Sequence, residues 1–358
     1  MTSVSKIAGG GGGGDGAAVE QQARRGPEAP LVARVFASLA DGEFHSGEEL
    51  AETLGVSRSA VWKAGKALRD LGATLHAVRN RGYKLVAVSE PLDAGKIREH
   101  LATRSVRDRV RSLDVAWSVS SSNTILFERS NPPNGTCEVF LAEYQTAGRG
   151  RRGRTWVAPP GGAICLSLSW TFREVPADLG ALSLVIGVCS LRALASLGIE
   201  SARLKWPNDL LIDDRKLGGI LIELRAESAG PACVVIGVGV NVSLGAPLLK
   251  SLAEAGVAAT DLASACVSRP VSRNEMAAGL VTNYVLGLLE FEKEGLKPFS
   301  EEWKQVDALR GRPVSVQGVE GTTKGLARGI DLHGALLVET PHGLKKFISG
   351  DVSVRATS

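Results

Sequence analysis

The nine residues from Gly148 to Trp156 restrict the fold of this chain more than any other segment. Four of them are arginine and three are glycine, so the segment offers almost nothing to a core and is expected to form a loop. The planar guanidinium group of arginine binds carboxylates and phosphates through paired hydrogen bonds, and glycine lets backbone N–H groups approach the same anion. We therefore expect an anion-binding loop for a ligand that carries phosphate groups.

The glycines of this loop also match the G-x-G-x-x-G pattern of dinucleotide-binding folds, through Gly148, Gly150 and Gly153. That pattern requires a helix directly after it, whereas the residues that follow include two prolines and two glycines and do not favour a helix. We therefore reject a dinucleotide site. By itself the loop is equally typical of a solvated or nucleic-acid-binding Arg/Gly segment, so its neighbours in the sequence must decide.

The composition is that of a globular protein of two or three domains, with 358 residues, 44% of them hydrophobic and 22% charged. The uncharged stretch from Leu179 to Leu191 is too short to cross a bilayer. The N-terminus has six glycines from Gly9 to Gly14 and does not resemble a secretory signal, so we expect a cytoplasmic protein without a membrane span. The five cysteines lack zinc-site spacing and are expected to be reduced and mostly buried.

The chain after residue 30 begins with short helical patterns that have clear ends. Ser46 and Glu49 form a capping box at the start of one helix, and Gly55 ends it. Ser57 then caps a second helix, whose apolar residues recur at helical spacing. Two short helices joined by a tight turn are typical of a helix-turn-helix.

The second of these helices and the hairpin-like stretch after it are strongly basic. Between Ser57 and Lys84 there are seven lysines or arginines and one acidic residue, Asp70. This pattern predicts a DNA-binding winged helix-turn-helix, and the alternative is a small helical domain with a solvated basic face. Trp62 is either a DNA contact or a core residue. The residues that we expect to contact DNA are Ser57, Arg58, Ser59, Lys63, Lys66, Arg79, Arg81 and Lys84.

The middle of the chain, from about residue 91, has longer apolar segments. Apolar and polar residues alternate from Ile164 to Thr171, which predicts a half-buried strand, and Leu179–Leu197 is expected to be a buried helix. Two further strands are expected at Leu217–Leu224 and Cys233–Val242, with a polar turn at Ser228–Gly230 between them. We therefore predict a mixed sheet covered by helices.

Three polar clusters lie at the expected ends of these elements: Ser121-Ser122-Asn123, Lys205-Trp-Pro-Asn-Asp-Leu210 and Lys216-Leu-Gly-Gly-Ile-Leu221. Ligand sites are usually built at such positions. Each cluster also has an ordinary explanation, as a helix cap, a turn or a strand edge with a solvated lysine. Their occurrence together with the arginine loop favours a single ligand site.

In this order, the clusters closely resemble motifs of the bacterial biotin protein ligases of the bifunctional kind, which also repress the biotin operon. The likeness extends from about residue 33 to residue 355. It implies a multidomain α+β protein with a winged helix-turn-helix, a central class II synthetase-like mixed sheet with helices, and a C-terminal SH3-like β-barrel. The matching segments are Glu143–Trp156, Lys205–Leu210, Arg215–Leu221 and Gly237–Asn241.

The resemblance implies a division of the chain into consecutive parts. These are a Gly-rich tail at 1–30 that is expected to be disordered, a DNA-binding domain at 31–90, a biotin- and ATP-binding catalytic domain at 91–308, and an SH3-like domain at 309–358. Short strand-like pieces agree with such a C-terminal barrel, at Pro313–Gln317, Ala335–Glu339, Lys345–Ile348 and Val352–Arg355.

The resemblance also implies roles for individual residues. Those expected to bind biotin are Ser121, Ser122, Asn123, Gln145, Arg149, Gly150, Arg151 and Lys216. Those expected to bind ATP or the adenylate are Arg149, Arg151, Arg152, Arg154, Trp156, Lys205, Asn208 and Asn241. The catalytic residues are expected to be Lys216, Arg149, Arg151 and Asp209, although Asp209 is equally suited to capping its turn. One position departs from the family, because Ser120 stands where an acidic residue is common.

The implied reaction forms biotinyl-5'-AMP from biotin and ATP with Mg²⁺, under an arginine loop that closes as a lid. Biotin then passes to a lysine of the biotin carboxyl carrier protein of acetyl-CoA carboxylase. No metal ligand of the protein's own is expected. Ligand-linked dimerisation would present two recognition helices to operator DNA. Two alternatives stay open: a ligand-sensing winged-helix regulator without catalysis, and a lipoate-type ligase.

Overall fold

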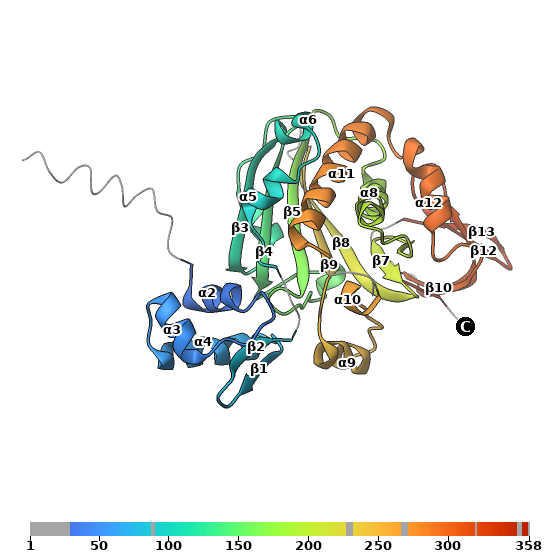
Figure 1. Ribbon diagram of the computed structural model, residues 1–358. Coiled ribbons are helices and arrows are strands. Elements are labelled where there is room, and N and C mark those ends of the chain that lie inside the picture. The colour runs from blue at the N-terminus through green and yellow to red at the C-terminus, as the bar shows by residue number, and fades with distance from the viewer. Residues whose placement is uncertain are drawn as a thin grey trace, which may run out of the picture.

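The structure is a computed structural model that describes residues 29–86, 90–226, 232–265, 271–318, 321–348 and 353–356. It contains an N-terminal helical unit, a central sheet with helices on both faces, and a C-terminal antiparallel sheet (Figure 1). This order is the one that the sequence predicts. The expected polar turn at Ser228–Gly230 and the Gly-rich tail up to residue 28 lie outside the described residues.

The N-terminal unit is a helix-turn-helix followed by a β-hairpin. Its elements are α2 (Leu31–Ser38), α3 (Gly47–Leu54), α4 (Arg58–Asp70), β1 (Leu75–Val78) and β2 (Gly82–Leu85). Both hydrogen bonds of the capping box between Ser46 and Glu49 are present, and Gly55 ends α3 in the left-handed conformation with φ 66°. The Ser57 hydroxyl accepts from the Ala60 N–H at the start of α4. The predicted helix ends are therefore found where the sequence places them.

The central sheet is mixed and has seven strands, in the order β3-β4-β5-β9-β8-β7-β6. Only β3 and β4 are parallel, and the other neighbours are antiparallel. The long hairpin of β8 and β9 brings the Lys216 motif beside the Gly237–Asn241 motif. The strands are β3 (Val110–Val119), β4 (Cys137–Gln145), β5 (Ala163–Phe172), β6 (Arg203–Lys205), β7 (Asp209–Ile212), β8 (Arg215–Ala226) and β9 (Ala232–Asn241).

The prediction that the strand from Ile164 to Thr171 is half-buried is wrong, because every residue of β5 is buried. Its apolar side chains face α8 (Leu182–Ser196) and α11 (Arg273–Glu294) in the main core. Its other face is covered by α7 (Ser122–Glu128), which packs on β4, β5 and β9. The serines on that face bury their hydroxyls in hydrogen bonds rather than exposing them to solvent. The alternation of residue types along β5 therefore distinguishes an apolar face from a polar face, and both faces are buried.

Helices complete the central unit and close its apolar face (Figure 1). The segment Leu179–Ser196 has the length and mean hydropathy, 1.8, of a membrane span, but 61% of it is buried in the protein, as expected for a core helix. It begins with a short 3-10 turn and continues as α8, so the predicted buried helix is present. The remaining helices are α5 (Ala94–Glu99), α6 (Arg104–Arg107), α9 (Ala246–Glu254), α10 (Leu262–Ala265) and α12 (Ser300–Val306).

The C-terminal sheet is antiparallel throughout, with five strands in the order β13-β12-β11-β10-β14. The sequence indicates four of them, and it gives no signal for β11 because that strand is polar and contains two internal glycines. The indole N–H of Trp206 donates to the Gly334 carbonyl at 3.0 Å, which fastens this sheet to the central unit. The strands are β10 (Pro313–Gly318), β11 (Gly321–Ile330), β12 (Leu336–Thr340), β13 (Gly343–Phe347) and β14 (Ser353–Ala356).

A buried ion pair fixes the chain where it enters the central unit. The Arg273 guanidinium lies 2.8 Å from the Glu143 carboxylate, and their side chains are 1% and 6% exposed. Arg273 also donates to the carbonyls of Glu90 and Ala163, while Glu143 accepts from the Leu92 N–H. Together these bonds join the segment 90–92, the start of α11, β4 and the start of β5 at one point.

Replacing Arg273 by Met is expected to lower the free energy of unfolding by about 3–5 kcal/mol, because Glu143 would be left as a buried, unpaired charge. Urea unfolding measures this difference. Arg104→Met is the matched control, since its pair with Asp108 is exposed and no measurable loss is expected. An Arg273→Met protein as stable as this control would contradict the structural role of the buried pair.

Candidate active site

A cavity of about 820 Å³ opens at the end of the central sheet, between the arginine loop and the hairpin of β8 and β9. Every residue for which the sequence implies a ligand contact or a catalytic role lines it. Residues of the C-terminal unit, among them Leu309 and Arg312, close one side. Clusters that are far apart in the sequence therefore meet in one place, as the sequence predicts.

One end of the cavity is polar but uncharged, and it is built by the start of α7 against β4 and β5. The Gln145 side-chain oxygen accepts from both the N–H and the hydroxyl of Ser122, at 2.8 and 3.1 Å. The buried Ser167 hydroxyl lies 2.8 Å from the Ser122 hydroxyl and 2.5 Å from the Asn123 side-chain oxygen. Ser121 is also buried here and precedes α7. Such a network fixes its donors and acceptors in place and suits a neutral polar ligand group.

Two glycines of β9 allow other parts of the site to approach this strand. A Cβ atom at Gly237 would lie 2.3 Å from the Asn123 side-chain oxygen, and one at Gly239 would lie 2.5 Å from the Trp156 ring. No side chain can occupy those positions without displacing its neighbour. The glycines of the Gly237–Asn241 motif are therefore required by close packing on the strand.

The arginine loop is a tight hairpin that leads from β4 into β5. Arg149 and Thr155 form an antiparallel bridge, and the Gly150 N–H donates to the Arg154 carbonyl at 2.7 Å. Arg152 turns the chain with φ 58°. The third glycine, Gly153, ends a 3-10 turn of three residues, and the next regular element is the strand β5 rather than a helix, so the rejection of a dinucleotide fold agrees with the structure.

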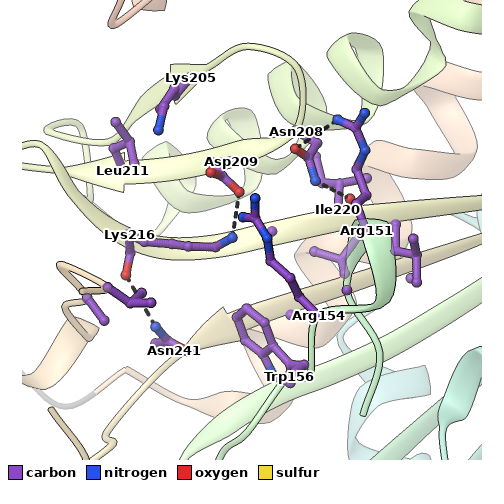
Figure 2. A pocket seen from close by; sticks show the side chains of 18 of the residues that line it. Arg151, Arg154, Trp156, Lys205, Asn208, Asp209, Leu211, Lys216, Ile220 and Asn241 are labelled. Atoms are coloured by element: carbon purple, nitrogen blue, oxygen red, sulfur yellow. Dashed lines mark hydrogen bonds and ion pairs between the residues drawn. The ribbon is translucent and has the colours of Figure 1, made fainter. Parts of the chain in front are cut away.

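The loop arginines reach different parts of the cavity wall. Arg149 donates to Glu223 on β8 at 2.6 Å, and Arg151 donates to the Asn208 side-chain oxygen at 3.2 Å. Figure 2 shows Arg154 pointing from the loop toward Asp209. The loop thus lines the cavity with positive charge and is bonded to β8 and to the turn before β7.

The opposite wall is formed by β7 and β8 (Figure 2). The Lys216 ammonium lies 2.6 Å from the Asp209 carboxylate, and the Asn241 amide donates to the Lys216 carbonyl at 3.3 Å. Asn208 is held to the Ile220 backbone by two hydrogen bonds. Asp209 therefore forms an ion pair with Lys216. The sequence offers two roles for this carboxylate, in catalysis or as a cap of its turn, and neither of them includes this pairing. Lys205, on β6, adds a further cation to the lining.

Comparisons with known proteins agree with this geometry. The family model described as Biotin/lipoate A/B protein ligase family matches residues 115–241, an HTH domain model matches 36–84, and a Biotin protein ligase C terminal domain model matches 310–355. The bifunctional ligase/repressor BirA of Escherichia coli is 38% identical over 323 residues, which are 90% of this chain and 97% of the relative. The chain belongs to the biotin protein ligase family. The resemblance inferred from the motifs is thereby confirmed.

Further relatives of this family member support the same assignment. A biotin–[acetyl-CoA-carboxylase] ligase of Mycobacterium tuberculosis is 33% identical over 73% of this chain and 98% of the relative. Among solved structures, a biotin protein ligase from Aquifex aeolicus in complex with biotin and ATP has a TM-score of 0.58 and 27% identity, and covers 69% of this chain and 100% of that one. The match to the Aquifex protein therefore extends over the greater part of both folds.

The sequence does not single out every residue that builds the site of this biotin protein ligase family member. Ser167 is counted there as exposed, because β5 is taken to be half-buried, yet its hydroxyl is central to the polar network. Glu223 is the one charged residue in the apolar stretch from Leu217 to Leu224, and that anomaly is a usable signal. Leu309 and Arg312 lie beyond every motif and reach the cavity only through the fold.

The predicted DNA-contacting face of this family member is exposed for the most part. Trp62 is 52% exposed on α4, so it is not a core residue. Lys66 pairs with Asp70 on the same helix at 2.8 Å, and the Arg81 guanidinium lies 4.2 Å from the centre of the Phe44 ring. Lys84 is half-buried. The other predicted contacts are exposed on α4, at its N-cap or in the hairpin turn, and they are Ser57, Arg58, Ser59, Lys63 and Arg79.

Four cysteines of this family member lie in the described residues, and one of them, Cys165, lines the cavity. Cys137, Cys165, Cys189 and Cys233 are free and buried, and Cys266 lies outside the described residues. Burial raises the pKa of the Cys165 thiol to about 11 and that of Cys137 to about 12, so both stay protonated at neutral pH. Among the described residues, no group of three or more His, Cys, Asp and Glu side chains is placed to hold a metal ion.

Proposed function

We propose that the protein is an ATP-dependent ligase that attaches biotin to a lysine of a biotin carboxyl carrier protein and also represses transcription in response to biotin. One observation carries the ligase proposal: a single cavity joins a neutral polar end to a wall of arginines and lysines. The biotin ring system would lie against Ser122, Asn123 and Gln145. The biotin carboxylate and the ATP phosphates would then lie between the arginine loop and Lys216.

The first step is adenylation. A carboxylate oxygen of biotin attacks the α-phosphorus of ATP, the bond to the β-phosphate oxygen breaks, and pyrophosphate leaves with biotinyl-5'-AMP remaining bound. Negative charge builds on the phosphate oxygens, where Lys216, Arg149 and Arg151 supply fixed positive charge. Asp209 holds the Lys216 ammonium in position through their ion pair.

The second step is transfer to the carrier. The uncharged amine of the acceptor lysine attacks the carbonyl carbon of the mixed anhydride, the bond to the AMP oxygen breaks, and AMP leaves. The amine proton must be accepted as the amide forms, and Asp209 is the carboxylate of the cavity nearest to Lys216. The arginine loop keeps water from the anhydride until the carrier arrives.

Magnesium fits this site as a companion of ATP. The lining of the cavity includes the Asp209 carboxylate, and among the described residues no three His, Cys, Asp or Glu side chains are grouped to hold a metal ion. Mg²⁺ is commonly held by substrate phosphates, water and one or two carboxylates. Bound in this way, it would neutralise phosphate charge during adenylation.

The repressor role is assigned to the N-terminal unit. We take the hairpin of β1 and β2 as the wing of a winged helix-turn-helix and α4 as the helix that enters the major groove. A ligand-linked homodimer would present two such helices to operator DNA in the cytoplasm. The proposed domains are 31–90 for DNA binding, 91–308 for catalysis, and 309–358, which we take as an SH3-like barrel.

The decisive experiment mixes the protein with biotin, MgATP and a biotin carboxyl carrier domain, and follows the mass of the carrier and the release of pyrophosphate. Gain of one biotin on the carrier lysine, dependent on ATP, supports the ligase. If no pyrophosphate were released, a ligand-sensing regulator without catalysis would be favoured. If lipoate competed with biotin and appeared on the carrier, the lipoate alternative would be preferred.

A side chain at position 237 tests the polar end of the cavity. Gly237→Ala is expected to raise the KM for biotin by about tenfold or more. The new Cβ atom would lie 2.3 Å from the Asn123 side-chain oxygen, so Asn123 would have to move. Gly180→Ala is the control, since a Cβ atom there meets nothing within 4 Å. Steady-state kinetics with the carrier domain measures both proteins. An unchanged KM in Gly237→Ala would place the biotin ring system elsewhere.

A further inference from the structure

Glu223 joins the two halves of the cavity, although no motif includes it. Its Oε2 atom accepts from the Asn123 side-chain N–H at 2.9 Å and from the Arg149 guanidinium at 2.6 Å. Its side chain is 24% exposed. One carboxylate oxygen on β8 therefore contacts both the neutral polar end of the cavity and the arginine loop.

The contact with Asn123 fixes which way that amide points. The Asn123 oxygen accepts from the Ser167 hydroxyl at 2.5 Å, and its nitrogen donates to Glu223 and to the Leu221 carbonyl at 3.4 Å. A rotated amide would place its oxygen against two acceptors, the Glu223 carboxylate and the Leu221 carbonyl, whereas the Ser167 hydroxyl is able to donate or to accept. Glu223 and the Leu221 carbonyl thus determine the orientation of Asn123.

The contact with Arg149 is of a different kind, because it spans from a loop to the sheet. The Arg149 side chain is 43% exposed, so solvent weakens the pair and a bound anion is able to displace the carboxylate. Arg149 also lines the cavity in which the proposed anionic ligand would bind. Two anions would then compete for the same guanidinium group.

We propose that Glu223 is a positioning residue that holds Arg149 when the site is empty and releases it to the anionic part of the ligand, while it keeps Asn123 oriented throughout. The inference rests on the proposed function, since it takes the biotin carboxylate and the ATP phosphates as the competing anions. Glu223 itself contacts no reacting atom. The charge of Glu223 therefore affects the affinity for biotin and ATP and the position of the arginine loop in the empty site. It leaves the rate of adenylation unchanged.

The test separates the charge of Glu223 from its hydrogen bonds. Glu223→Gln keeps a side-chain oxygen for the Asn123 N–H and removes the charge that holds Arg149. Trypsin cleavage at the loop arginines is expected to be about threefold faster in this variant than in the wild type without ligand, which is the size of effect of a partly exposed ion pair. With saturating biotin and MgATP, the two proteins are expected to be cleaved equally slowly, because the ligand then holds Arg149.

Kinetics give a second readout. Glu223→Gln is expected to lower the KM for biotin by about threefold with kcat unchanged, because the ligand no longer competes with a carboxylate for Arg149. Glu223→Ala, which also frees Asn123, is expected to raise the KM instead. Loop cleavage and KM unchanged from the wild type in Glu223→Gln would overturn the proposal. So would faster cleavage with and without ligand alike, which indicates a merely structural role.

A matched control and a separate criterion keep the interpretation clear. Glu138→Gln removes a carboxylate of similar exposure, 21%, from the same sheet, where it pairs with Arg129 at 3.3 Å, and it is expected to change neither readout. Cleavage in the absence of ligand does not depend on catalysis. If the wild-type protein attached no biotin, the proposed function would fail, while faster ligand-free cleavage of Glu223→Gln would still show that Glu223 holds the loop.

Discussion

Replacement of Lys216 by Met is expected to slow pyrophosphate release from biotin and ATP by about 10²–10³-fold, the loss that follows removal of one fixed charge from the developing charge of a transition state. Lys216 is suited to this role because it is less than one-third exposed and is held by Asp209 at 2.6 Å. Its ammonium group therefore needs little reorganisation when the phosphate charge develops. Stopped-time assays of pyrophosphate at saturating substrates measure the rate.

Lys304→Met is the control for this replacement. Lys304 forms an ion pair with Glu301 on the exposed side of α12, and its loss is expected to leave the rate unchanged. Lys216→Arg is expected to recover part of the rate, since it restores the charge with a different geometry. If Lys216→Met kept a rate within about threefold of the wild type, the charge at this position would not stabilise the transition state.

Replacement of Arg151 by Ala is expected to let the adenylate escape. Pyrophosphate release would continue, whereas the amount of biotin transferred to the carrier per pyrophosphate would fall, with dissociation of biotinyl-5'-AMP faster by about tenfold or more. That is the effect of losing one hydrogen bond to a charged group. Arg151 also joins the loop to the turn between β6 and β7 through Asn208, so its loss would open the cavity on the side proposed for the phosphates. Retention of labelled adenylate during gel filtration measures the escape.

Arg203→Ala provides the comparison, because Arg203 is exposed on β6 and its guanidinium bonds only to nearby backbone carbonyls in the contacts described. It is expected to retain the adenylate as the wild type does. Undiminished retention by Arg151→Ala would show that the arginine loop does not act as a lid.

The sequence carried enough local information to predict the helix-turn-helix and the clusters that line the cavity. Ser46, Gly55 and Ser57 define helix ends through bonds to backbone groups a few residues away, and such bonds depend little on the rest of the fold. The residues that line the cavity could be predicted for another reason. They occur as short motifs in a fixed order, and a resemblance to a known family reports the site that such motifs build together.

What the sequence could not give depends on neighbours far along the chain. The strand β5 is buried on both faces because α7 covers one of them and α8 and α11 cover the other. Alternation of residue types in the sequence indicates the polarity of each face, but it does not indicate which elements cover that face. The strand β11 was missed because its residues are polar and its partners lie in other segments.

By itself, then, the sequence determined the order of the units, the helix ends, the arginine loop and the family. Only the tertiary structure decided that Asp209 faces Lys216, that Ser167 bonds Asn123, and that Glu223 bridges Asn123 and Arg149. The physical reason is separation along the chain. Glu223 is 100 residues from Asn123 and 74 from Arg149, and a hydrogen bond between such residues exists only after the sheet has brought their strands together.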